Sequence, residues 1–369
     1  MSASAASRRS RLPAATLAAV DYVALFPAGT AELVAAGLQS LLPGADVLDS
    51  DDSALSFATQ ARLDSRDAVP IARNLFLVLA RVGRRDLNGT AADLARRVRD
   101  LPRPRGSSGF RVMFHVDGQL VASSPQARLT LEDAISAATG LRPKPRGNCQ
   151  EYWVIGRRHW PAMYLAERLP GGREGPPAQQ GSLSGELSAL LVSLSRPDPQ
   201  DVFLDPFAGS GSIVRARLAT PAQKVIFNDR NESLSRSAAA RLGNHAGLVF
   251  SHDDGTSMTS VKSAEVSAIV TDPPWGEHDE SIGDYAQFTR SVAAEFSRLL
   301  NPHRGRLVLL VSRRHAEQLQ DSLGEAGFGC EPPTGILVNG HPASVICGYP
   351  RSRVSAPVRH RSKRRGCFP

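Results

Sequence analysis

Cysteine is scarce in this sequence, and no two cysteines are close together. The four cysteines among 369 residues stand at 149, 330, 347 and 367, and none forms a CxxC pair. This spacing predicts neither a zinc site nor a disulfide framework and is typical of a reducing compartment. We therefore expect a cytoplasmic protein that binds no metal.

Long apolar runs are also missing. No stretch reaches the roughly 18 apolar residues that a membrane-spanning helix needs, so no membrane contact is expected. The first residues combine arginines with a short apolar stretch, but no clean cleavage site follows, which argues against a signal peptide. We interpret residues 1–17 as a disordered start.

Acidic residues are absent from both ends of the chain. Residues 351–369 carry seven basic groups and no acid, and residues 71–175 carry 18 basic groups against nine acidic ones. A basic middle segment beside a mildly acidic C-terminal part suits a protein that holds a polyanion in one module and processes it in another. Solvated surface arginine is the alternative for the tails. The densest basic cluster consists of Arg81, Arg84, Arg85, Arg96, Arg97 and Arg99.

A Gly- and Pro-rich stretch divides the chain. Residues 169–182 read as a linker, and residues 351–369 as a basic disordered tail. Between them, residues 183–350 alternate short apolar strands with helical patterns, which predicts a doubly wound, mostly parallel sheet. Asn339-Gly340 predicts a hairpin that closes this sheet with an antiparallel edge. Residues 18–168 have an α+β pattern.

The first candidate site is the stretch LDPFAGSGSIVRAR at 204–217. Asp205 ends a predicted strand, and Gly209 and Gly211 permit a tight turn before a helix. Val214 stands where a dinucleotide-binding turn would have its third glycine, so that pattern fails. An acid at the strand end suits hydroxyls or a cationic amine better than phosphate. The turn comprises Asp205, Pro206, Phe207, Gly209, Ser210 and Gly211.

Acids also follow the next two predicted strands. Asp229 stands 24 positions after Asp205, where an acid binds ribose hydroxyls, although it could equally cap the following helix. Asp253 and Asp254 follow the third strand, and Asp254 is the preferred contact for an adenine amine. Because parallel strand ends share one sheet edge, these acids predict a site for a nucleoside with a non-phosphate tail, S-adenosylmethionine.

The fourth strand runs into TDPPWG. Pro273 and Pro274 donate no backbone N–H and fix two φ angles, so the carbonyls of Asp272 and Pro273 can face a substrate. Two acceptors would bind the N–H groups of a planar amine and free its lone pair, and Asp272 could then take the proton. Trp275 would stack on the base. A rigid turn with a core tryptophan is the alternative.

DPFAGSG followed by TDPPWG resembles the class I methyltransferases that act on exocyclic amines of nucleic-acid bases. Within them, residues 181–213 resemble the THUMP-domain tRNA guanine-N2-methyltransferases and their bacterial relatives. The resemblance implies a Rossmann-like methyltransferase domain over 183–350, a ferredoxin-like segment over 18–100 and a THUMP-like RNA-binding domain over 101–168. It assigns the cofactor turn, the ribose acid Asp229 and the adenine contact Asp254, with an amine-binding motif at 272–275.

One departure from the family keeps the target base open. The aromatic residue after the two prolines is Trp275 rather than the commoner Tyr or Phe, and Asp-Pro-Pro-Trp also occurs in adenine-N6 methyltransferases. Guanine N2 in tRNA is the first hypothesis, and adenine N6 in rRNA or DNA the second. A third is an RNA-binding protein with an inactive methyltransferase fold, against which the four strand-end acids argue.

Overall fold

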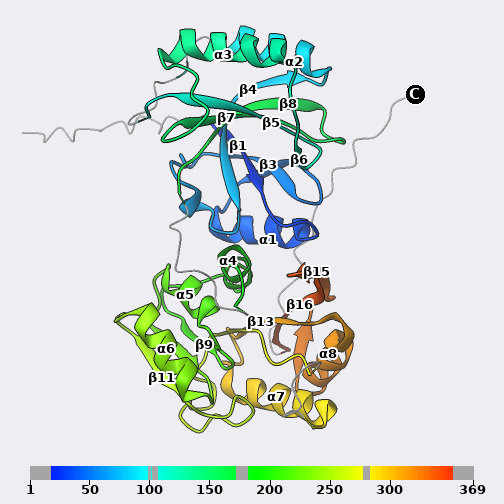
Figure 1. The fold of residues 1–369 in the computed structure, drawn as a ribbon. Helices are drawn as coiled ribbons and strands as arrows, with labels where there is room; N and C mark the ends of the chain where they lie inside the picture. Colours follow the sequence, from blue (N-terminus) through cyan, green and yellow to red (C-terminus); the bar gives the residue numbers. More distant parts are fainter. Residues whose placement is uncertain (1–17, 99–100, 102–106, 172–181, 277–282, 352–369) are drawn as a thin grey trace, which may run out of the picture.

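The computed structural model describes residues 18–98, 101, 107–171, 182–276 and 283–351 and arranges them around two eight-stranded sheets (Figure 1). The linker predicted over 169–182, the start over 1–17 and the tail over 351–369 fall almost wholly outside these ranges. In the described part, no helix is long and apolar enough to cross a membrane.

The N-terminal half forms one sheet with strand order β2-β3-β1-β4-β8-β7-β5-β6. Its ten-residue strand β4 pairs with β1 on one side and β8 on the other, so a single sheet runs through both predicted N-terminal segments. The domain boundary at residue 100 therefore stays a prediction. Helix α2 packs with α3 over the second part of the sheet. The elements are β1 Val20–Leu25, α1 Ala31–Leu41, β2 Asp46–Ser50, β3 Ala54–Thr59, β4 Asn74–Gly83, α2 Leu87–Arg97, β5 Phe110–Val116, β6 Gln119–Leu120, α3 Pro125–Thr139, β7 Gln150–Gly156 and β8 Ala162–Arg168.

The C-terminal half is the predicted doubly wound sheet, with strand order β11-β10-β9-β12-β13-β16-β14 and β15 paired to β16. The first five strands are parallel, and β16 is antiparallel to β13. The elements are α4 Gly185–Leu194, β9 Val202–Asp205, α5 Ser212–Leu218, β10 Lys224–Asn228, α6 Glu232–Leu242, β11 Leu248–Ser251, β12 Ala268–Thr271, α7 Tyr285–Leu299, β13 Arg306–Ser312, α8 Ala316–Glu325, β14 Phe328–Cys330, β15 Thr334–Val338 and β16 His341–Pro350.

Alternating side chains of the parallel strands build two cores. Phe203 and Phe227 join the core under α4, α5 and α6, while Leu204 and Ile226 join the core under α7 and α8. Helices therefore cover both faces, as a buried parallel sheet requires. The predicted hairpin forms at Asn339-Gly340, where both residues have positive φ.

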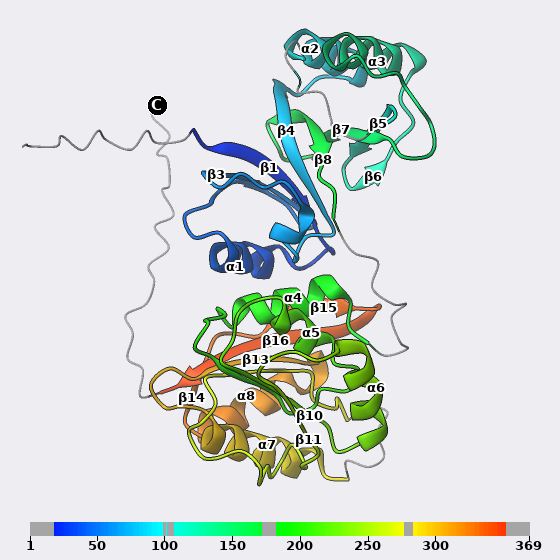
Figure 2. The ribbon, with the colours of Figure 1, turned by 90° about the vertical axis from the view of Figure 1, so that its left-hand side faces the viewer.

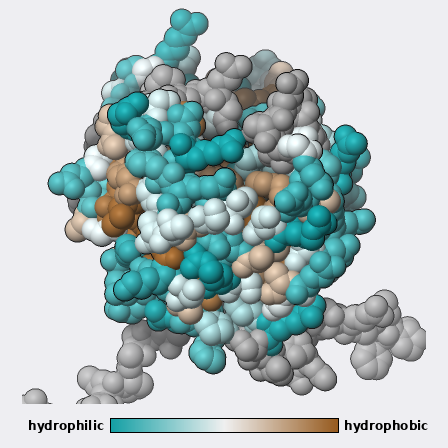
Figure 3. Space-filling view, turned by 90° about the horizontal axis from the view of Figure 1, so that it is seen from below, coloured by the Kyte–Doolittle hydropathy of each residue, from teal (hydrophilic) through white to brown (hydrophobic). Residues whose placement is uncertain are grey.

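Helix α1 of the N-terminal half packs on α4 of the C-terminal half, as Figure 2 shows. Gly37 allows the close approach, because a Cβ built there would come within 2.5 Å of Ser193 Oγ. One apolar core continues across this contact, and Arg66 pairs with Glu186 at 3.2 Å. Figure 3 views the molecule from below, from the end that the C-terminal half forms in Figure 1. This face is mostly hydrophilic, with smaller apolar areas.

Candidate active site

The carboxyl ends of β9, β10, β11 and β12 place the predicted acids along one edge of the sheet. Strand β9 lies between β10 and β12, so Asp205 stands at the centre of this row. The four strands end in loops whose residues contact one another, and the sequence-predicted turn, ribose acid and amine motif meet there. This meeting follows from the parallel order of the strands.

Asp205 is buried, with 1% of its surface exposed. Its Oδ1 accepts a hydrogen bond from the Thr271 hydroxyl at 2.6 Å and another from the amide of Phe207 at 3.3 Å. Burial, assisted by the neighbouring carboxylates of Asp272 and Asp229, raises the pKa of Asp205 to about 7, although the hydrogen bonds from Thr271 and Phe207 act to lower it. This carboxyl therefore links the end of β12 to the loop after β9 rather than standing open to solvent.

The Gly-rich turn has the backbone that its sequence predicts. Gly209 and Gly211 have φ values of +49° and +76°, and Gly211 is the N-cap of α5. A Cβ at Gly211 would approach the Phe227 ring to 3.2 Å. The Phe207 ring lies against Gly255 of the third loop, where a Cβ would come within 2.6 Å of it. Phe207 thus closes the turn against the loop that carries Asp254.

Asp229 has hydrogen bonds to two backbone amides. Its Oδ2 accepts from Gly209 at 2.8 Å and its Oδ1 from Asn231 at 2.8 Å. The N-cap of α6 is Asn231, whose side chain accepts from the amide of Ser233. Asp229 is therefore not the helix cap, and it joins the Gly-rich turn to the second loop. The ribose role stays a prediction, and the carboxylate keeps further lone pairs for it.

The two acids after β11 have different surroundings. Asp253 accepts hydrogen bonds from Ser260, Thr259 and Ser251, which together lower its pKa even though burial acts to raise it. Asp254 is exposed and accepts from the amide and hydroxyl of Thr256, which lower its pKa. Asp253 therefore holds its own loop together, and Asp254 remains the predicted adenine contact.

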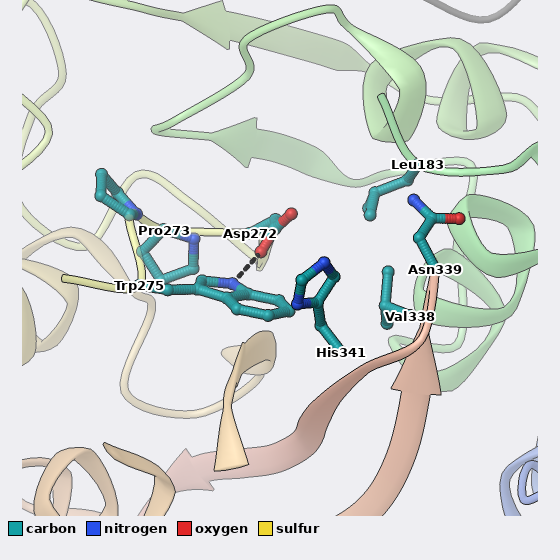
Figure 4. Close-up of a pocket in the computed structure, with 8 residues that line it drawn as sticks. Leu183, Asp272, Pro273, Trp275, Val338, Asn339 and His341 are labelled. Carbon is teal, nitrogen blue, oxygen red and sulfur yellow. Dashed lines mark hydrogen bonds between the residues drawn. The ribbon is translucent and has the colours of Figure 1, made fainter. Parts of the chain in front are cut away.

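Asp272 and Trp275 are joined by a hydrogen bond that the motif did not indicate. The indole Nε1 donates to Asp272 Oδ1 at 2.7 Å (Figure 4). Burial raises the pKa of Asp272 to about 7, and the indole opposes this rise. Among the described residues, this is the single hydrogen bond to the carboxylate, so none of them competes with a substrate for Oδ2. The indole packs partly on the core under α4.

A pocket of about 310 Å³ opens beside this pair. Its walls come from the TDPPWG loop, from Leu183 ahead of α4 and from the β15–β16 hairpin (Figure 4). Pro273, Pro274 and Trp275 form one side of it. Its lining residues are Leu183, Asp272, Pro273, Pro274, Trp275, Val338, Asn339 and His341.

Sequence reasoning missed the hairpin contribution to this pocket and one buried amide. Asn228, at the end of β10, is completely buried. Its Nδ2 donates to the carbonyls of Pro206 and Asp253 at 2.9 and 3.0 Å, and its Oδ1 accepts from the amide of Asp253. One side chain thus fixes the first and third loops relative to the second strand. A polar residue ending an apolar strand was the available signal.

The basic residues predicted to hold RNA do not form one patch. Asp93 pairs with both Arg85, at 3.3 Å, and Arg96, and Arg97 is exposed on the same helix. Arg81 lies over the Tyr164 ring on the face of the sheet opposite α2, since Ala80 and Val82 point to α2. Arg84 donates to the carbonyl of Arg157 and pairs with Asp117, and Arg99 lies outside the described residues.

In the described ranges, no group of three or more His, Cys, Asp or Glu side chains is arranged so that it could hold a metal ion. The loops do suit S-adenosylmethionine, since they present carboxylate acceptors beside a glycine turn whose positive φ angles leave its backbone without side chains. Asp229 and Asp254 would hold hydroxyl and amine groups of the nucleoside, with Phe207 and Gly209 beside them.

Comparison with known proteins agrees with this geometry. The family model "UPF0020: RMKL-like, methyltransferase domain" matches residues 173–220 and 230–330. A tRNA (guanine(6)-N2)-methyltransferase of Thermus thermophilus is 29% identical over 226 residues, which cover 58% of this chain and 64% of the relative. The match thus spans less than two thirds of that relative. Both matches are methyltransferases, as the resemblance of the motifs leads one to expect.

Solved structures confirm the fold. The crystal structure of TrmN from Thermus thermophilus has a TM-score of 0.65 and 23% identity, covering 90% of this chain and 99% of that one. A putative methyltransferase complexed with SAH has a TM-score of 0.55 and 13% identity, covering 90% and 98%. The doubly wound C-terminal sheet is therefore as predicted, and the ferredoxin-like and THUMP-like assignments remain predictions.

Removal of the Asn228 amide tests whether this side chain holds the site together. We expect Asn228→Ala to lower the free energy of unfolding by about 3 kcal/mol, because three buried backbone groups lose their partner. Denaturant unfolding followed by circular dichroism measures this change. The control is Asn244→Ala, at an exposed asparagine in the loop after α6. If both variants unfold at the same denaturant concentration, the hydrogen bonds of Asn228 do not stabilise the loops as its contacts indicate.

Proposed function

Because its C-terminal domain matches the RMKL-like methyltransferase family, we propose that this protein methylates an exocyclic base amine of RNA, with guanine N2 of tRNA as the target. The observation that carries the proposal is the position of Asp272. It stands at the end of the strand next to the cofactor turn and lines a pocket bordered by prolines and an indole. The Thermus relative, named for guanine-N2 methylation of tRNA, supports the choice of base.

The cofactor of this reaction would be S-adenosylmethionine. When bound, it supplies a methyl group activated by the positive charge of its sulfonium. Asp205, Pro206, Phe207, Gly209, Ser210 and Gly211 would form its turn, with Asp229 at the ribose and Asp254 at the adenine.

The chain's own contribution to catalysis would be to orient the amine and to take its proton. An exocyclic amine is a weak nucleophile because its lone pair is delocalised into the ring. Asp272 Oδ2 and the Pro273 carbonyl would each accept a hydrogen bond from one of its N–H groups and so make the lone pair more available. Asp272 Oδ2 would then receive the proton that the nitrogen loses. Trp275 would hold Asp272 Oδ1 while its ring borders the base.

Loss of the Asp272 carboxylate should abolish most of the activity. We expect Asp272→Ala to lower kcat by at least about 100-fold on tRNA, the range typical of a positioned acid–base group. Nucleoside digestion and mass spectrometry of the RNA product identify the methylated base. The control is Asp321→Ala, an exposed acid on α8.

Three outcomes would change the proposal. Near-normal methyl transfer by Asp272→Ala would refute the assigned mechanism. Formation of N6-methyladenosine instead of N2-methylguanosine would favour the adenine hypothesis. If calorimetry detects RNA binding but no S-adenosylmethionine binding, the protein is an RNA-binding protein with an inactive methyltransferase fold.

The raised pKa of Asp272 predicts a pH dependence. Only the ionised carboxylate accepts two N–H groups or a proton, so kcat should rise with pH and level off above about 7. In Trp275→Phe the indole donor is gone, and because that donor lowers the pKa, the rise should move to higher pH. Rates between about pH 5.5 and 9 at saturating substrates measure both effects. A profile that stays flat, or moves to lower pH in Trp275→Phe, would contradict the assigned role of Asp272.

RNA, and tRNA in particular, is the proposed partner, and the proposed location is the cytoplasm. The basic middle segment would hold the phosphate backbone, which gives affinity without reading sequence. Arg85, Arg96 and Arg97 stand together near α2 and are the described part of the predicted cluster best placed to act jointly.

Combined replacement of these three arginines by alanine should weaken RNA binding and its dependence on salt. Each lost phosphate contact reduces the slope of log K against log salt by about one. Filter binding of tRNA at several salt concentrations measures the slope, with Arg236→Ala on the outer surface of α6 as control. An unchanged slope would remove these residues from the RNA site. If truncation after Pro350 abolishes the slope, the tail rather than the middle segment holds the RNA.

A further inference from the structure

The hairpin side of the pocket contains polar groups that the proposed reaction does not use. Asn339 stands in the β15–β16 turn and His341 begins β16, and both line the pocket with Asp272. In Figure 4 His341 lies between the indole of Trp275 and the amide of Asn339. Asp272 and the pair from the hairpin therefore border the same small space from different elements.

The apolar lining leaves a place for a flat ring. Leu183 and Val338 stand on the hairpin side, and Pro273 and Trp275 on the loop side. A base in this space would have these apolar side chains beside it, and the polar groups of the pocket would be Asp272, Asn339 and His341. The volume of about 310 Å³ is at the small end of ligand pockets, which suits one nucleobase.

The edge chemistry of the two candidate bases differs next to the reacting amine. In guanine, the N2 amine adjoins the N1–H donor, and the O6 acceptor follows. In adenine, the N6 amine adjoins N1, which is an acceptor without hydrogen. Asp272 accepts hydrogen bonds from either amine when ionised, so it cannot distinguish the two bases.

A carboxamide can distinguish them. The Oδ1 of an asparagine accepts and its Nδ2 donates, which matches N1–H and O6 of guanine in one bidentate contact. We propose that Asn339 is the residue that selects guanine, and that His341 forms the pocket wall beside it. This inference rests on the proposed function and names the group that sets its base specificity.

The hairpin turn alone could explain an asparagine at this position. The test must therefore separate the need for a turn residue from the proposed contact with guanine. Asn339 has a φ of +51°, a conformation that Asn and Gly adopt readily in hairpin turns. Asn339→Gly therefore keeps the turn and removes the amide. Asn339→Asp keeps the turn and the acceptor for N1–H but loses the donor for O6.

The experiment compares guanosine with 2-aminopurine at the methylated position of a synthetic tRNA. The analogue keeps the reactive amine but lacks O6 and the N1–H. The wild-type protein should prefer guanosine by about 5- to 150-fold in kcat/KM, the range for one bidentate contact. In Asn339→Gly, kcat/KM should fall for guanosine but not for 2-aminopurine, so the preference is lost. In Asn339→Asp, kcat/KM for guanosine should fall as well. His341→Ala should lower kcat/KM on both substrates alike.

The control is Leu337→Ala, which changes an exposed side chain of β15 that does not line the pocket. It should leave the preference unchanged. If Asn339→Gly methylates guanosine and keeps the full preference, Asn339 does not select the base, and the proposed function stands. If the wild-type protein instead forms N6-methyladenosine, the proposed function fails on its own evidence, whatever the variants do.

Discussion

The constraint on which this site depends is the desolvation of two carboxyl groups at the ends of neighbouring strands, with Asp205 buried and Asp272 half-buried at the pocket. Asp205 ends β9 and Asp272 follows β12, and burial raises the pKa of each to about 7. Buried like charges are costly, so each group needs a donor. Thr271 supplies one to Asp205 and Trp275 supplies one to Asp272. The TDPPWG stretch therefore provides both donors as well as one of the acids.

The second requirement is that loops from different strands stay in register. Asn228 ties the first loop to the third, and Asp229 ties the Gly-rich turn to the second. Phe207 fills the space over Gly255. These contacts join groups of the protein to one another, so the edge of the sheet is organised by its own side chains. Preorganisation of this kind lowers the cost of binding a cofactor.

Much of this could be predicted from the sequence, because local patterns determine strands, helices and turns. The alternation of apolar strands and helices over 183–350 predicted the doubly wound sheet, and Asn339-Gly340 predicted its hairpin. Chain order along a parallel sheet then brought the four acids to one edge. What could not be predicted were the partners across the edge. Asn228 reads as one polar residue at the end of the strand KVIFN, and nothing local shows that it reaches two other loops.

The same limit applies to the hairpin and to Trp275. A turn sequence predicts a backbone shape but not that Asn339 will face the TDPPWG loop, which depends on β16 pairing with β13. For Trp275, an aromatic face could be foreseen, but not the direction of its N–H. That direction gives this tryptophan a consequence that phenylalanine could not have, since a phenyl ring donates no hydrogen bond. With the indole in place, Asp272 is ionised over more of the neutral pH range, and its Oδ2 can accept from an amine that is itself a weak nucleophile. Trp275, which leaves the base identity open in the sequence, is thus the residue that prepares Asp272 for either base. In our proposal, selection between the bases falls to Asn339 on the opposite wall of the pocket.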